Sequence, residues 1–171
     1  MRMDTSDIKA IVKEFHPIFF KISKSYTRDA ADFDDLYQEV LIQVWRSLKN
    51  FRGDSRSSTW VYRVALNTAM TFHRDRKRKY RLFSGEEIER LPERIEHQDT
   101  SDQEEKLALM YRSIQQLPQA DRALILLQLE GKSFQEIAEI LGISVSNVGV
   151  KLMRSRKKIQ TYIQKSGYER V

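Results

Sequence analysis

The most specific pattern in this sequence is Phe134-Gln-Glu-Ile-Ala-Glu-Ile-Leu-Gly-Ile-Ser-Val-Ser-Asn-Val148, which predicts two short helices joined by a tight turn. Such a pair needs a small residue where its helices approach, a residue that tolerates a positive φ in the turn, and an apolar residue that holds the second helix against the first. Ala138, Gly142 and Val148 stand at those three places. Ser144 is a suitable N-cap for the second helix. The stretch therefore predicts a helix-turn-helix.

The second of these helices is amphipathic in a way that suits DNA. Val145, Val148, Leu152 and Ile159 fall on one side of a helical wheel and predict its buried face. The residues expected to contact DNA lie on the opposite side of the helix, on the flanks of that side and at the N-cap. They are Ser144, Ser146, Asn147, Val150, Lys151, Arg154, Lys157 and Lys158. In a major groove the first of these would reach base edges, the valine would meet a thymine methyl, and the cations would hold phosphates. A solvated basic face on a helical hairpin is the alternative.

The whole chain has the composition and periodicity of an all-α protein. It holds 3 prolines and 6 glycines in 171 residues, and its apolar residues recur at steps of three and four almost throughout. We expect helices over about 5–25, 33–48, 58–78, 101–116, 119–129, 133–141 and 144–166. The pattern breaks over 81–103, where turn formers mix with acids. The sequence thus predicts two small helical domains, 1–80 and 104–171, joined by a flexible acidic linker, 81–103.

The distribution of charge is more informative than the net charge of +6. Residues 51–83 carry 9 basic and 2 acidic side chains, and residues 106–171 carry 11 and 5. Between them, residues 84–105 carry 2 basic and 9 acidic side chains, whereas residues 1–50 are balanced with 8 of each. Two basic blocks that flank an acidic segment indicate two modules that each meet a polyanion.

Composition also excludes several kinds of site. No cysteine is present, which excludes disulfides, thiolate metal sites and cysteine nucleophiles. The apolar runs are far shorter than a membrane span, and the N-terminal residues hold no secretory signal stretch, so we expect a cytoplasmic protein with no membrane insertion. The three histidines, His16, His73 and His97, form no recognised metal or acid–base pattern. We therefore expect no catalytic residue, no metal and no cofactor.

The helix expected over 33–48 has a surface that suits a protein partner. Its core stripe is expected to be Tyr37, Val40, Leu41, Val44 and Leu48. Its opposite side carries Asp35, Gln38, Glu39 and Arg46, with Ile42 among them and Trp45 at the edge. An apolar side chain ringed by acids and amides can be the centre of a protein interface, although a harmless exposed side chain is the commoner case. Spacing alone leaves both interpretations open.

The helix expected over 58–78 and the segment before it suit single-stranded nucleic acid. The expected inward residues are Val61, Val64, Ala65, Thr68 and Phe72, and the expected outward residues are Arg63, Asn67, Arg74 and Arg78. Just upstream, Phe51, Trp60 and Tyr62 alternate with Arg52, Arg56, Ser57, Ser58 and Thr59. Bases can stack on such rings or enter pockets between them while the cations follow the phosphates. Phe51 and Trp60 can also be core residues, and a half-buried wall is the expected compromise.

Both halves of the chain resemble one family, the extracytoplasmic-function sigma factors. The resemblance to their region 2 rests on Asp34-Asp35-Leu36-Tyr37-Gln38-Glu39-Val40, Phe51-Arg52-Gly53-Asp54-Ser55 and Ser58-Thr59-Trp60-Val61-Tyr62-Arg63-Val64-Ala65-Leu66-Asn67. The resemblance to region 4 rests on Leu117-Pro118-Gln119-Ala120-Asp121-Arg122 and Glu130-Gly131-Lys132-Ser133-Phe134-Gln135-Glu136-Ile137-Ala138. The two sets occur in the family's order and cover nearly the whole chain, which is far more specific than either half.

The resemblance implies a protein that directs RNA polymerase to promoters and catalyses no reaction itself. Its implied partners are core RNA polymerase, through the β′ clamp helices and the β flap, promoter DNA, and an anti-sigma factor. The implied polymerase-binding residues are Asp35, Gln38, Glu39, Ile42, Trp45 and Arg46. The implied minus-10 residues are Phe51, Arg52, Arg56, Ser57, Ser58, Thr59, Trp60, Arg63, Asn67, Arg74 and Arg78. The helix from Ser144 onward is the implied minus-35 reader.

The chain departs from its apparent relatives in the minus-35 helix. Many of them place a basic residue and a serine where this chain has Gly149 and Val150, so the family-average contacts are not expected in full. Gly149 costs roughly 1 kcal/mol of helix propensity relative to alanine. This cost suggests a close approach of the backbone to DNA or to a neighbouring helix, and simple tolerance fits equally well.

Two rival functions stay open at this point. The first is a stand-alone helix-turn-helix regulator with an N-terminal sensor or dimerisation domain, which predicts tight duplex binding without polymerase. The second is a nucleic-acid enzyme such as a helicase subunit or nuclease. The absence of a phosphate-binding glycine loop from the sequence argues against the second rival.

Overall fold

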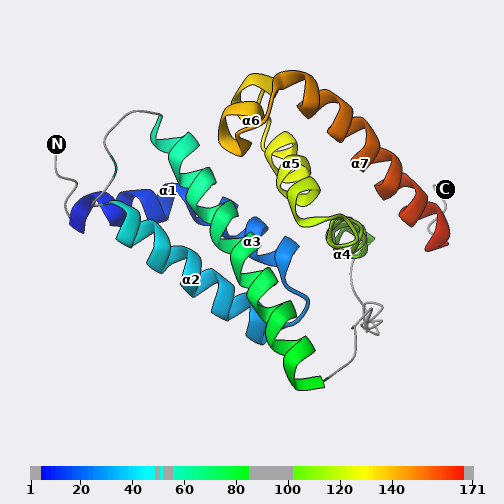
Figure 1. The fold of residues 1–171 in the computed structure, drawn as a ribbon, viewed down its shortest axis with the longest axis horizontal. Helices are drawn as coiled ribbons and strands as arrows, with labels where there is room; N and C mark the ends of the chain where they lie inside the picture. The colour runs from blue at the N-terminus through cyan, green and yellow to red at the C-terminus, as the bar shows by residue number, and fades with distance from the viewer. Residues whose placement is uncertain (1–4, 49–50, 52–55, 85–101, 168–171) are drawn as a thin grey trace.

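The computed structural model describes residues 5–48, 51, 56–84 and 102–167, and Figure 1 shows its fold. Within these residues the chain forms seven α-helices and no strand. They are α1 (Thr5–Tyr26), α2 (Ala30–Leu48), α3 (Ser57–Ser84), α4 (Asp102–Gln115), α5 (Gln119–Leu129), α6 (Phe134–Leu141) and α7 (Val145–Lys165). The predicted all-α class is confirmed. No helix in this part of the chain is both long and apolar enough to cross a membrane.

The first three helices form a bundle around a shared core (Figure 1). Apolar residues at three- and four-residue steps turn one side of each helix inward. Phe19 of α1, Val40 of α2 and Ala65 of α3 are all 0% exposed. Leu36, which the predicted core stripe omits, is also fully buried, while Tyr37 and Leu41 are only partly buried against that core.

The buried side of α3 is wider than predicted. Tyr62, Leu66 and Ala69 are buried, although none was expected inward. Val64, Thr68 and Phe72 were expected inward and are only partly buried. The reason is that α3 contacts α1, α2, α5 and α6, so its buried surface exceeds the single stripe that one neighbour would require.

The last four helices form a second module centred on α5. Every residue from Arg122 to Leu127 is buried. This helix contacts α4, α6 and α7, and it also contacts α1 and α3 of the first bundle. A continuous apolar run is the expected pattern for a helix that is surrounded on all sides.

The two modules lie against each other in one body. α1 contacts α4 and α5, and α3 contacts α5 and α6, so the second module covers one side of the first (Figure 1). Buried apolar residues from both modules form a single hydrophobic cluster. Prediction from the sequence treats the modules as separate units on a flexible linker and does not anticipate this packing.

Two helix ends differ from the predicted ones by more than one residue. α2 begins at Ala30 rather than Phe33, because the Asp29 carboxylate accepts a hydrogen bond from the backbone N–H of Asp32 at 2.8 Å and supports an earlier first turn. α3 continues to Ser84 rather than ending at Arg78, since no proline or glycine follows to stop it before residue 85. Most of the predicted linker lies outside the described residues.

Candidate partner and nucleic-acid interfaces

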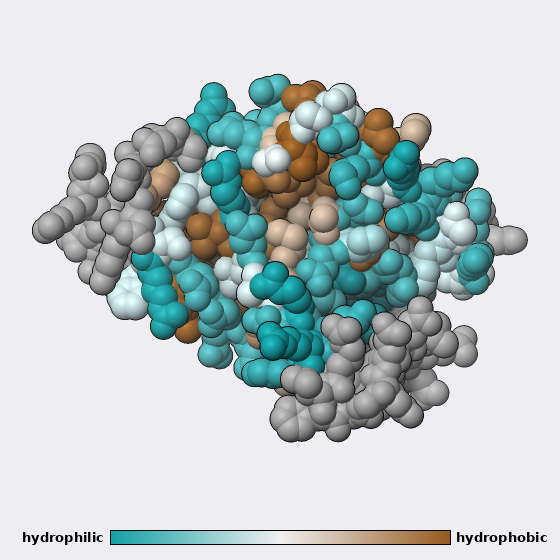
Figure 2. All heavy atoms as spheres, viewed as in Figure 1, coloured by the Kyte–Doolittle hydropathy of each residue, from teal (hydrophilic) through white to brown (hydrophobic). Residues whose placement is uncertain are grey.

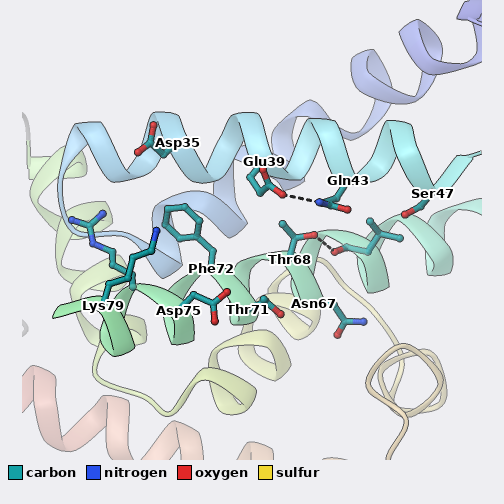
Figure 3. Close-up of a pocket in the computed structure, with 12 residues that line it drawn as sticks. Asp35, Glu39, Gln43, Ser47, Asn67, Thr68, Thr71, Phe72, Asp75 and Lys79 are labelled. Carbon is teal, nitrogen blue, oxygen red and sulfur yellow. Dashed lines mark hydrogen bonds between the residues drawn. The ribbon is translucent and has the colours of Figure 1, made fainter. Parts of the chain in front are cut away.

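The predicted partner surface on α2 consists of two adjoining faces. The outward face contains Gln38, Ile42, Trp45 and Arg46, which are all exposed. Two of these side chains are apolar, with Ile42 at 38% and Trp45 at 50% exposure. Asp35 and Glu39 instead line a groove between α2 and α3 (Figure 3). The outward face therefore presents an apolar pair beside a groove whose α2 side carries two carboxylates.

The groove between α2 and α3 has a volume of about 720 Å³ and a mixed lining. In Figure 3 the polar side chains of α2 lie opposite those of α3. The Glu39 carboxylate accepts a 2.7 Å hydrogen bond from the Gln43 amide. The groove is lined by Asp35, Glu39, Gln43 and Ser47 of α2 and by Val64, Asn67, Thr68, Thr71, Phe72, Asp75, Arg76 and Lys79 of α3. It thus joins residues predicted to bind polymerase with Asn67, which is predicted to contact DNA.

An ion-pair cluster fixes the start of α2 against α3. The Arg76 guanidinium is paired with the Asp32 carboxylate and lies 3.8 Å from the Asp29 carboxylate. Asp32 is buried. This cluster was not predictable from the sequence, because acids at a helix N-terminus are common in their own right and the cation lies on another helix. No group of three or more possible metal ligands occurs among the described residues.

An aromatic wall stands at the start of α3. The rings of Phe51 and Trp60 lie with their centroids 5.0 Å apart and their planes at 43°. Both side chains are partly buried, as the predicted half-buried wall requires. Arg56 and Ser57 are exposed nearby, and Ser58 is partly buried. Rings, a cation and hydroxyls therefore lie on one part of the surface.

Thr59 and Arg63 face the second module. Thr59 is only 5% exposed, because α6 packs beside this part of α3, and its contact with DNA stays a prediction. The Arg63 guanidinium donates a 2.7 Å hydrogen bond to the backbone carbonyl of Glu139 on α6. A hollow of about 440 Å³ is lined by Arg56, Thr59, Ser133, Gln135, Glu136 and Glu139. Part of the predicted minus-10 surface therefore lies where the modules meet.

The remaining predicted minus-10 residues lie along the outer side of α3. Asn67, Arg74 and Arg78 are exposed. The Arg74 guanidinium lies 3.9 Å from the Asp75 carboxylate, an exposed contact that contributes little to stability. Arg52 lies outside the described residues.

The helix-turn-helix has the predicted local structure. The Ser133 hydroxyl accepts a 3.2 Å hydrogen bond from the Glu136 N–H, and the Glu136 carboxylate accepts one of 2.9 Å from the Ser133 N–H. The backbone and side-chain hydrogen bonds of Ser133 lower the pKa of Glu136. Gly142 ends α6 with a φ of 66°. Ala138 and Val148 are buried between the two helices.

The predicted DNA face of α7 is open to solvent. The Ser144 hydroxyl caps the helix by accepting a hydrogen bond from the Asn147 N–H at 3.3 Å. The exposed residues of this face are Ser144, Ser146, Asn147, Val150, Lys151, Arg154, Lys157 and Lys158, and hydrophilic atoms dominate the visible surface of α7 (Figure 2). The Lys158 ammonium lies 3.6 Å from the Asp121 carboxylate of α5, so this cation is directed toward the module itself.

Three apolar or small residues modify this face. Val145 was predicted on the buried side and is 41% exposed, because it stands at the first position of α7, ahead of the turns that pack inward. A Cβ on Gly149 would lie 3.6 Å from the ring of Phe134, an ordinary contact distance, so packing does not require glycine there. Val150 is 44% exposed, and the predicted DNA face thus includes an apolar side chain.

Two family models match this chain. The model described as Sigma-70 region 2 matches residues 11–79. The model described as Sigma-70, region 4 matches residues 107–159. The first match covers the α2 face, the groove and most of α3, and the second covers the helix-turn-helix.

Curated relatives match over almost the full chain. The RNA polymerase sigma-H factor of Pseudomonas aeruginosa is 33% identical over 165 residues, which cover 90% of this chain and 84% of the relative. The ECF RNA polymerase sigma-E factor of Escherichia coli K12 is 31% identical over 176 residues, which cover 95% of this chain and 91% of the relative.

Two solved structures share the fold. The sigma factor RpoE, in complex with the anti-sigma factor NepR from Bartonella quintana, matches with a TM-score of 0.73 at 20% identity, over 94% of this chain and 98% of that one. CnrH, in complex with the cytosolic domain of CnrY, matches with a TM-score of 0.67 at 20% identity, over 95% and 90%.

Proposed function

Because the chain belongs to the extracytoplasmic-function group of the sigma-70 family of RNA polymerase sigma factors, we propose that its two modules divide promoter recognition between them. As a member of this family, it directs promoter-specific initiation of transcription by RNA polymerase. A stand-alone helix-turn-helix regulator does not require region 2. The match to region 2 over residues 11–79 therefore argues against that alternative function.

The outward face of α2 is the proposed binding site for the β′ clamp helices of core polymerase. The observation that carries this proposal is the exposed apolar pair, Ile42 and Trp45, between the polar residues Gln38 and Arg46. Aromatic and aliphatic side chains inside a polar rim are typical of the energetic centre of an interface. Asp35 and Glu39 would extend this surface along the groove.

The start of α3 is proposed to capture the minus-10 strand once the duplex opens. The wall of Phe51 and Trp60 supports this role, because partly exposed rings can stack against unpaired bases. Arg56 lies beside the wall, and Asn67, Arg74 and Arg78 follow along the exposed side of α3. The three arginines would hold the phosphates of the same strand, and the neutral Asn67 amide would add a hydrogen bond.

α7 is proposed to read the minus-35 duplex. Ser146, Asn147 and Val150 stand in its first turns, where a recognition helix meets base edges. Lys151, Arg154 and Lys157 are exposed further along and would contact phosphates. Each site is small, and polymerase would make them act together by holding both modules at the promoter spacing.

We propose that region 2 occupies residues 1–80, that the acidic linker occupies residues 81–103 and that region 4 occupies residues 104–171. The working compartment would be the cytoplasm, where RNA polymerase acts, and region 4 would also contact the β flap.

The chain itself would catalyse no reaction, since sigma factors serve initiation without being enzymes. RpoE is seen in complex with the anti-sigma factor NepR, which supports control of this chain by an anti-sigma factor.

The proposed polymerase site is tested by Ile42→Asp. Phe20→Asp is the matched control, because Phe20 of α1 is similarly exposed at 43% while Ile42 is 38% exposed. A carboxylate in the centre of the interface would weaken binding to purified core polymerase by about tenfold or more, because the buried charge would have no partner. Biolayer interferometry measures this affinity. Equal affinities of the two variants would contradict the assignment.

A further inference from the structure

The outward face of α7 has an apolar centre. Val150 is 44% exposed, and Met153, at 66%, is the most exposed large apolar side chain that the structure describes. Val150 stands two positions from each of the buried residues Val148 and Leu152, and two positions turn an α-helix by about 200°. The valine therefore points away from the core. Met153 follows it by three positions, which makes the two side chains neighbours on the helix surface.

Gly149 leaves room for these two side chains to form one surface. A long side chain on a helix leans toward the N-terminus and covers the turn before its own Cα. Met153 therefore leans toward the turn that holds Gly149 and Val150. A Cβ on Gly149 would meet no neighbour closer than the Phe134 ring, at 3.6 Å, so the space over the glycine is free for the methionine. A longer side chain at position 149 would compete for it.

We infer that Val150 and Met153 determine promoter specificity by packing against thymine methyl groups in the minus-35 duplex. This inference rests on the function proposed for α7, and it names the base that the centre of the helix reads. In the major groove, the methyl group of thymine is the one apolar group that the four bases present. An apolar pair on a reading helix has its natural complement there.

The other bases fit less well opposite this pair. In the major groove guanine presents two acceptors, adenine an acceptor and a donor, and cytosine a donor. Valine has no hydrogen-bonding group in its side chain, and the methionine sulfur is only a weak acceptor. A polar base edge covered by these side chains would lose its water without a replacement hydrogen bond. A thymine methyl gains free energy when it is covered in the same way.

Polar side chains beside the pair hold the helix in the groove without naming a base. Lys151 and Arg154 are exposed on the flank of the pair, where they are proposed to contact phosphates, and such contacts carry no sequence information directly. One turn before the valine, the Ser146 hydroxyl lies 3.1 Å from the Ser144 hydroxyl. The flexible methionine side chain can adapt to the exact position of a methyl group. Discrimination at the centre of the element therefore falls to the apolar pair.

Uracil tests the inference from the side of the DNA, because it differs from thymine only by the missing methyl group. Holoenzyme made from the full chain and core polymerase first selects its minus-35 sequence from promoters randomised at those positions. We expect thymine at one or more selected positions, and uracil there should weaken binding about three- to fivefold for each methyl removed. Uracil at thymines upstream of the element is the control and should change nothing. Selected sequences without thymine, or equal affinities for thymine and uracil, would overturn the inference.

Two substitutions test it from the side of the protein. Met153→Gln and Val150→Thr replace an exposed apolar group by a polar one of similar size, and both should bring the thymine-to-uracil ratio of affinities close to one. Leu107→Gln is the matched control, because Leu107 is a 51% exposed apolar residue of α4, and it should keep the ratio of the wild type. A wild-type ratio in both α7 variants would refute the assignment. A holoenzyme that starts no transcripts at discrete promoters would instead contradict the proposed function.

Discussion

Gly142 shows how one backbone conformation positions the proposed DNA-reading helix. Its φ of 66° turns the chain between α6 and α7, and nothing lies within 4 Å of a Cβ built there. The cost of Gly142→Ala is therefore backbone strain alone. We predict a loss of about 1 kcal/mol in the free energy of unfolding, measured with urea.

Gly149→Ala is the matched control for that substitution. Gly149 lies inside α7, and an alanine Cβ would sit 3.6 Å from the Phe134 ring without a clash. Alanine is the better helix former, so the free energy of unfolding should rise by up to about 1 kcal/mol. Changes of the same sign at both glycines would contradict this account of the turn.

His73 is partly buried on α3, and its surroundings favour the neutral imidazole. Burial lowers its pKa from the ordinary 6.5, the charges of Arg122, Arg28 and Lys77 lower it further, and a hydrogen bond with the backbone of Tyr26 opposes them. The unfolded chain therefore takes up this proton at a higher pH than the folded chain. The stability gained is fully present above about pH 6.5 and is lost as the pH falls through the folded pKa.

The pH dependence of unfolding tests the environment of His73. Between pH 7.5 and 5.5 the free energy of unfolding of the wild type should fall more steeply than that of His73→Gln, which cannot take up the proton. Urea titrations at several pH values measure both slopes. Identical slopes would show that His73 keeps its ordinary pKa in the folded chain.

Residues whose role is local could be predicted from the sequence. Ala138, Gly142 and Ser144 follow from the steric needs of one turn and one helix cap, and the structure has all three in place. Thr59 could not be placed in this way. It is buried by a helix more than seventy positions further along the chain, and no local pattern reports that contact.

The helix α2 shows which features of an element can be predicted from the spacing of its apolar residues and which cannot. The three- and four-residue spacing predicts an amphipathic helix and most of its buried residues. It does not separate Gln38 and Ile42, which face solvent, from Asp35 and Glu39, which border the groove. That division depends on where α3 crosses α2, and the two helices meet through their buried apolar residues and through the Arg76–Asp32 pair.

The cations of α7 are adjacent in sequence and differ in environment. Lys158 is held near Asp121 at 3.6 Å, and Lys157 is exposed beside it. Lys157→Ala should weaken duplex binding by the holoenzyme and reduce the salt dependence of that binding by about one phosphate contact. Lys158→Ala should cause a smaller loss of affinity and a smaller change in salt dependence. Affinities measured at several salt concentrations give both slopes. A larger change for Lys158→Ala would contradict the assigned phosphate contacts.

For the whole molecule, the sequence predicts the order of the two modules and the all-α class but not their contact. The modules were predictable because each has its own motifs and its own apolar spacing. Their packing depends on pairs such as Arg63 and Glu139, which are 76 positions apart. The acceptor is the backbone carbonyl of Glu139, and no side-chain pattern in the sequence indicates which carbonyl a distant arginine will meet.

Reconstituted transcription tests the central claim most directly. Purified full-length chain is added to core RNA polymerase on sheared genomic DNA of the source organism, and the 5′ ends of the transcripts are mapped. We predict new starts at a small set of discrete positions that require the chain and that are lost with Ile42→Asp. Duplex binding by the chain alone, with no starts added to those of core polymerase, would contradict its function as a sigma factor.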